Sequence, residues 1–146
     1  MRGRRLIPLA VAVALLVPAS PAAARKDPAR TDTPRAERAI AWFRAHLGTT
    51  AWEGYCELAV EQSFGTRHRY ANARSNWESG RGRQHRDWRR APRGALVFWS
   101  TSADAHVAIS LGDGTVLTTS GHGARIGRVP MTWFGRPLGW KRADWA

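Results

Sequence analysis

The sequence predicts a single α+β domain in which helices come first and an antiparallel sheet follows. Between residues 33 and 79, apolar residues recur at the three- and four-residue steps of amphipathic helices. After Pro92 the pattern changes to short apolar and alternating runs, which are typical of strands. A strong hairpin signal, Gly112-Asp113-Gly114, lies within this second part. Helices followed by an antiparallel sheet define α+β organisation.

The first 24 residues are typical of a secretory signal peptide and not of the folded domain. Three arginines within the first five residues precede an apolar run over residues 6–17, and small residues lead to an A-x-A-like site at Ala22–Ala24. The run is shorter than the roughly 20 residues of a membrane-spanning helix. We therefore expect cleavage and export, followed by a polar linker over residues 25–32 and the domain over residues 33–146.

The chain is strongly basic, with 23 lysines and arginines against 11 aspartates and glutamates. Cleavage after Ala24 lowers the basic count to 20 and leaves a formal net charge of +9. Such a cation is expected to bind polyanions, and outside a cell these are the anionic polymers of the envelope. Nucleic acid is not expected, because the alternating aromatic and basic residues of a stacking platform are missing. We expect a secreted or envelope-located monomer that makes no membrane contact after cleavage.

The first predicted helix runs from Thr33 to Gly48. Thr33 has the residue type of an N-cap, Pro34 suits the first helical position, and Gly48 is a typical stop. The apolar residues between them recur at helical spacing and predict a buried stripe made of Ala36, Ala39, Ile40, Phe43 and Leu47.

A second helix is predicted from about Tyr55 to Phe64, because Gly65 ends the pattern. Cys56, Val60 and Phe64 fall on one side at four-residue spacing, so Cys56 should lie in the first turn and face inward. A third, less regular helix is predicted over residues 70–79, with Trp77 as its anchor.

The segment 81–93 contains six arginines and is too polar to form a core element. We expect a loop that packs through Trp88 and binds anionic polymer through Arg83, Arg86, Arg89 and Arg90.

Strands are expected from residue 94 onward. The run "GALVFWS" over residues 94–100 predicts a buried strand, and residues 106–120 predict two strands joined at the Gly112–Gly114 turn. The segments 124–130 and 138–144 are candidates for two more.

Cys56 is the only cysteine, so it cannot form a disulfide within the chain. Exported proteins usually pair their cysteines, and an unpaired one is either reactive or a buried, inert thiol. A helix N-terminus favours thiolate, which predicts a pKa below the roughly 8.5 of a free thiol. His106 opens the first strand of the hairpin and is the candidate base for a Cys–His pair, although its residue type alone favours a structural histidine that is satisfied by backbone groups.

Three sequence segments, in this order along the chain, resemble those of a known group of enzymes. "YCELAVEQSFG", "APRGALVFWS" and "AHVAISLGDGTVL" are similar to the NlpC/P60 superfamily of papain-like cell-wall hydrolases and the related CHAP amidases. In those families a cysteine begins a helix, a P-x-G-x-L-V-F strand follows, and an HV-x-I-x-L-G-x-G hairpin carries the histidine. The resemblance covers about residues 50–120 and is loose beyond them.

The resemblance implies a papain-like fold in which N-terminal helices pack on a small antiparallel sheet. It also implies a peptidase or amidase that cleaves the peptide part of peptidoglycan, with Cys56 as nucleophile and His106 as base. No cofactor is implied, and the histidines, cysteine and acids show no spacing typical of a metal site.

Several positions depart from the family pattern. The third catalytic position, often histidine, is Thr118, with His122 as the alternative four residues later. Tyr55 precedes the cysteine where aspartate or glutamine is usual, and Glu57-Leu58 replaces the usual serine-glycine. Two hypotheses therefore stand: an active hydrolase, or a catalytically weak domain that binds wall polymer through its basic loop.

Overall fold

The computed structural model describes residues 34–81 and 83–145, and the signal peptide and linker expected from the sequence lie outside these residues. Helices precede strands along the chain, which confirms the α+β class. The elements are helices α1 (Pro34–Ala45), α2 (Cys56–Ser63) and α3 (Ala73–Glu78), a 3₁₀ turn η1 (Trp88–Arg90), and strands β1 (Leu96–Trp99), β2 (His106–Ser110), β3 (Thr115–Thr118), β4 (Gly127–Pro130) and β5 (Gly139–Lys141).

The five strands form one antiparallel sheet in the order β4-β3-β2-β1-β5. Strands β2 and β3 form the predicted hairpin, in which Ile109 pairs with Leu117 and Ser110 pairs with Val116. The residues of β1 and β2 are buried throughout. The start of β2, where His106 lies, is therefore held on a central strand of the sheet.

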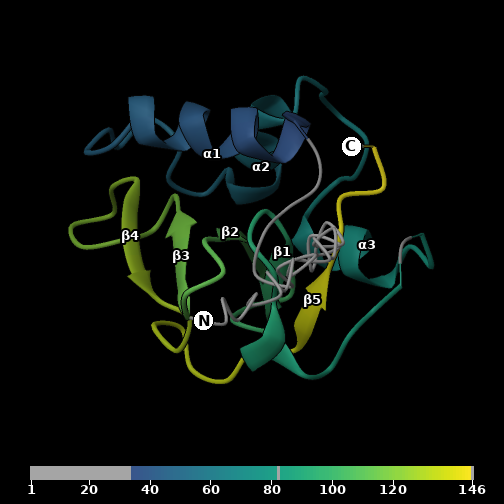
Figure 1. Cartoon of the computed structure of the whole chain (residues 1–146). Helices are drawn as coiled ribbons and strands as arrows, with labels where there is room; N and C mark the ends of the chain where they lie inside the picture. Colours follow the sequence, from purple (N-terminus) through teal and green to yellow (C-terminus); the bar gives the residue numbers. More distant parts are fainter. Residues whose placement is uncertain (1–33, 82, 146) are drawn as a thin grey trace, which may run out of the picture.

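Helices α1 and α2 lie together over one face of the sheet (Figure 1). Their buried residues meet every second residue of the strands, because successive side chains of a strand point to opposite faces. The main core contains Ile40 and Phe43 from α1, Ala59 and Val60 from α2, and Leu96, Phe98, Val107, Ile109 and Leu117 from the sheet.

The opposite face carries a second, smaller core that loops cover. Val97, Trp99, Ala108, Val116 and Val129 belong to it, and the partly buried side chains of Trp88 and Phe134 pack against it. This arrangement confirms that the arginine-rich segment packs through Trp88.

Gly139 lets the arginine-rich segment approach β5 closely. Its φ of +152° is rare for other residues, and a Cβ there would collide with the backbone carbonyl of His85. The close approach permits a two-way bridge, in which the His85 N–H donates to the Trp140 carbonyl at 2.8 Å and the Trp140 N–H donates back at 2.9 Å.

Two details of the helices differ from the prediction. Helix α1 ends at Ala45, so Leu47 lies beyond it and is 54% exposed instead of completing the apolar stripe. Helix α2 buries Glu57 and Glu61 in addition to its apolar residues. In the part of the chain that the structure describes, no helix is long and apolar enough to cross a membrane.

Candidate active site

A cleft of about 530 Å³ opens between the N-terminus of α2 and the start of β2. Cys56 and His106 both line it, so the fold brings together two residues that are 50 positions apart in the sequence. The remaining walls are mostly polar and include Glu53, Tyr55, Asn72, Ser102, Asp104 and Ser120, with Phe134 as an aromatic wall.

Cys56 is the first residue of α2 and carries a free, half-buried thiol. The backbone N–H groups of Val107, Glu57 and Cys56 itself favour the thiolate, as a helix N-terminus should. Burial nevertheless outweighs them and raises the pKa of Cys56 to about 11. The expected lowering of this pKa is therefore wrong for the ligand-free protein, because the apolar core beneath α2 removes water from the sulfur.

His106 is the first residue of β2 and is 7% exposed. Its ring lies 4.3 Å from the ring of Phe134, between centroids, and Nε2 lies 2.8 Å from the Thr118 hydroxyl oxygen. Burial lowers the pKa of His106 to about 4, so the imidazole is neutral at neutral pH. A neutral imidazole is the protonation state that a general base needs.

Thr118 and His106 meet because they lie on the same face of the β2–β3 hairpin. Ser110 pairs with Val116, and side chains two and four residues away alternate back to that face. The Thr118 hydroxyl also accepts the backbone N–H of Ser120 at 3.2 Å. In the tautomer that carries its proton on Nε2, His106 donates to Thr118 and leaves Nδ1 as an acceptor.

His122 does not lie against His106. It is exposed and contacts the ring of Trp133 edge-on, with 4.4 Å between ring centroids. Thr118, not His122, is therefore the third residue that the fold brings to the histidine.

Cys56 and His106 share the cleft without a mutual hydrogen bond among the described contacts. A neutral thiol beside a neutral imidazole is the resting state that their shifted pKa values favour. Catalytic hydrogen bonds are often long in ligand-free sites and shorten when substrate binds.

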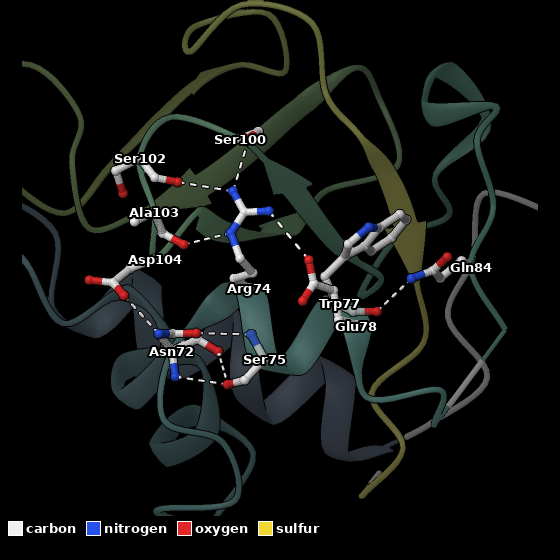
Figure 2. Close-up of polar contacts among 10 residues, drawn as sticks. All are labelled: Asn72, Arg74, Ser75, Trp77, Glu78, Gln84, Ser100, Ser102, Ala103 and Asp104. Carbon is white, nitrogen blue, oxygen red and sulfur yellow. Dashed lines mark hydrogen bonds and ion pairs between the residues drawn. The ribbon is translucent and has the colours of Figure 1, made fainter.

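Helix α3 fixes the loop that leads into His106 (Figure 2). The Arg74 guanidinium donates to the carbonyls of Ala103 and Ser102 at 2.5 and 3.0 Å and to the Ser100 hydroxyl at 2.9 Å. Asn72, the N-cap of α3, donates to the Asp104 carboxylate at 2.7 Å. Sequence reasoning missed this support, because an arginine in a polar helix gives no signal of the distant loop that it holds.

The backbone immediately before His106 is held in a rarely used conformation. Ala105 has a φ of +61°, a left-handed value that costs a non-glycine residue on the order of 1 kcal/mol. Its N–H donates to the Ser102 carbonyl at 3.1 Å, which closes the turn. Together with the contacts of α3, this turn determines the point at which β2 begins.

The four arginines predicted to bind polymer are exposed and lie away from the cleft. None of Arg83, Arg86, Arg89 and Arg90 is among the residues that line it. The Arg89 guanidinium lies 4.3 Å from the ring centroid of Trp88, and Arg90 contacts the Asp87 carboxylate at 4.0 Å. The arginines predicted to bind polymer and the Cys56–His106 cleft therefore lie on separate parts of the described structure.

Residues 34–81 and 83–145 contain no group of three or more histidines, cysteines and acids that could hold a metal ion.

Comparisons with protein-family models, curated proteins and solved structures found no match for this chain. The resemblance to NlpC/P60 and CHAP hydrolases therefore stays a prediction from the three sequence segments. Function is inferred from the cleft itself, because a fold alone does not determine an activity.

Replacing Thr118 is expected to slow hydrolysis, and replacing His122 is expected to do less. Thr118→Val removes the hydroxyl at nearly constant volume and should lower the rate roughly ten-fold, because one neutral hydrogen bond contributes about 1 kcal/mol. His122→Ala removes only a contact with the Trp133 ring. The measurement is the rate on a cell-wall peptide for both variants beside the parent. A large loss in His122→Ala, with Thr118→Val at the parent rate, would transfer the third role to His122.

Proposed function

We propose that this protein is an exported cysteine hydrolase, a peptidase or amidase that cleaves the peptide part of peptidoglycan. The observation that carries the proposal is one cleft that holds Cys56 at a helix N-terminus and a neutral His106 that is hydrogen-bonded to Thr118. The signal-peptide pattern and the basic composition support a substrate in the cell envelope.

The proposed reaction begins when the amide substrate enters the cleft. Cys56 transfers its thiol proton to Nδ1 of His106 while the sulfur attacks the carbonyl carbon. In this mechanism the backbone N–H of Cys56, in the first turn of α2, would donate to the developing oxyanion.

His106 then returns the proton to the leaving nitrogen as the C–N bond breaks, which leaves a thioester on Cys56. A water molecule attacks the thioester, gives a proton to His106 and releases the acid product with the thiol restored. The imidazole shuttles one proton in each half of the reaction, and no external reactant besides water is required.

The test is incubation of residues 25–146 with isolated peptidoglycan, followed by mass spectrometry of the released fragments. Sugar fragments that keep a shortened peptide indicate a peptidase, and glycan strands stripped of the whole peptide indicate an amidase. The control is the same protein after alkylation of Cys56. The proposal is wrong if the untreated and alkylated samples release the same fragments.

A second candidate function is binding of anionic wall polymer without turnover. The raised pKa of the thiol and the absence of a Cys56–His106 hydrogen bond among the described contacts favour this reading of the ligand-free site. The exposed arginines of the 81–93 segment supply the binding surface in either case.

Replacement of Arg83, Arg86, Arg89 and Arg90 by glutamine is expected to weaken binding to isolated wall material and to flatten its salt dependence. Exposed charges act through solvent and are screened by salt, so the parent should lose affinity as ionic strength rises. The matched control replaces four exposed arginines elsewhere, namely Arg38, Arg44, Arg67 and Arg69. Equal weakening in both variants would show that total charge, and not this segment, governs attachment.

A further inference from the structure

Two buried glutamates on α2 differ in how many hydrogen-bond donors reach their carboxyl groups. Glu61 accepts the backbone N–H groups of Arg69 and Tyr70 at 2.8 to 3.0 Å, so donors surround a carboxylate. Glu57 accepts one hydrogen bond, from the Asn76 side-chain amide to Oε1 at 2.7 Å. Its Oε2 has no partner in the described part of the chain, and the same is true of Oδ1 of Asn76.

These two bare oxygens are both deeply buried, since Glu57 is 5% and Asn76 0% exposed. Leaving a buried acceptor without a donor is costly, and a buried carboxylate without one costs more. Lys141 cannot supply the donor, because its three N–H bonds already point to the backbone carbonyl of Asn76, the hydroxyl of Ser79 and the backbone carbonyl of Arg81.

A proton on Glu57 turns one of the bare acceptors into a donor. The Asn76 amide then faces a carboxylic acid. Its Nδ2 donates a hydrogen bond to that acid, and its Oδ1 is available to accept one from the acid's proton. If the oxygen and nitrogen of the Asn76 amide are exchanged, Glu57 must still be protonated. An amide oxygen 2.7 Å from Oε1 of Glu57 requires a proton between the two oxygens.

We infer that Glu57, the residue after Cys56 on α2, is a neutral carboxylic acid held by Asn76, and that its neutrality permits Cys56 to become an anion. A charged Glu57 would raise the pKa of the adjacent thiol by repulsion. Glu57 is thus a positioning residue that sets the charge around the nucleophile. This role in catalysis rests on the proposed hydrolase function, whereas the protonation state of Glu57 does not.

The charges around Glu57 come from three elements. Glu61 on α2 and Asp144 after β5 disfavour its ionisation, and Lys141 on β5 favours it. Burial is the largest influence and raises the pKa of Glu57 to about 8, in agreement with the hydrogen bonds. An ionised Glu57 would place its negative charge next to Cys56, the proposed nucleophile.

The first test is the thermal stability of Glu57→Gln as a function of pH. Between the ordinary carboxyl pKa of 4.5 and about 8, the folded parent keeps a proton that the unfolded chain has lost. The stability of the parent should therefore fall as pH rises through this window. Glutamine is neutral, can donate to Asn76 and can accept from it, so this variant should lack that fall and melt higher than the parent at neutral pH.

The matched control is Glu61→Gln, one turn later on the same helix. Its carboxylate accepts only backbone N–H groups, so an amide would place a donor against donors. We expect its melting temperature to fall by roughly 5 °C or more. If Glu57→Gln were destabilised in the same way and its stability followed pH as the parent's does, Glu57 would be ionised and the inference would be wrong.

Two spectroscopic and chemical readouts are independent of stability and of turnover. An infrared carbonyl band of a protonated carboxyl group should be present in the parent at neutral pH and absent in Glu57→Gln. Alkylation of Cys56 by iodoacetamide should be faster in Glu57→Gln than in the parent above about pH 8, where the parent's Glu57 ionises. No such band and identical alkylation profiles would overturn the inference, whether or not the protein hydrolyses peptidoglycan.

Discussion

Cys56→Ala is expected to abolish hydrolysis of peptidoglycan peptides while leaving the fold intact. Removing the nucleophile from a covalent mechanism leaves only binding and oxyanion stabilisation, so the rate should fall roughly ten-thousand-fold or more. The thiol is half-buried at the end of a helix, and its loss should cost on the order of 1 kcal/mol of stability. The measurements are fragment release from isolated peptidoglycan and the circular dichroism spectrum.

A matched control for this variant lies on the same helix. Ser63→Ala also removes one small polar atom from α2, but at the last residue of the helix, where the Ser63 hydroxyl donates to the Val60 carbonyl at 2.6 Å. It should hydrolyse peptidoglycan at nearly the parent rate. Turnover by Cys56→Ala within a few-fold of the parent would remove Cys56 from the chemistry.

The elements of the fold could be predicted because their signals are local. Helix α2 begins at Cys56, one residue after the predicted start, and the hairpin turns at Gly112-Asp113-Gly114 as its glycines require. His106 and Thr118 lie on one face of this hairpin, because strand alternation carries both back to the face of the paired Ser110 and Val116. Each of these inferences needs only neighbours in the sequence.

The electrostatics of the site could not be predicted, because they depend on contacts between distant segments. A helix N-terminus indicated a lowered thiol pKa, but the core beneath α2 desolvates the sulfur and reverses the direction. The side chain that donates to Glu57 comes from Asn76 on α3, and Arg74 holds a loop 26 or more residues away. Charged and amide residues in helices give no sequence signal that they are buried or which partner they meet.

The pH dependence of hydrolysis is expected to be broad, because burial moves the pKa values of the Cys56–His106 pair apart. Protonation of His106 removes the base, so the rate should fall on the acid side near pH 4 instead of near the ordinary histidine value of 6.5. On the alkaline side the pair keeps its transferable proton up to about 11, but the charge that Glu57 gains near pH 8 should lower the rate before the proton is lost. A preformed thiolate–imidazolium pair would instead lose its proton well below that value.

His106→Asn is the variant that tests this assignment. Without a base the thiol must ionise by itself, so the residual rate should be lower than the parent rate by roughly a thousand-fold at neutral pH. That residual rate should then rise with pH toward the thiol pKa of about 11, whereas the parent rate should show no such rise. The measurement is kcat/KM on a soluble cell-wall peptide across pH for both proteins. Parallel profiles would mean that His106 takes no proton from Cys56, and the role of base would then pass to another group.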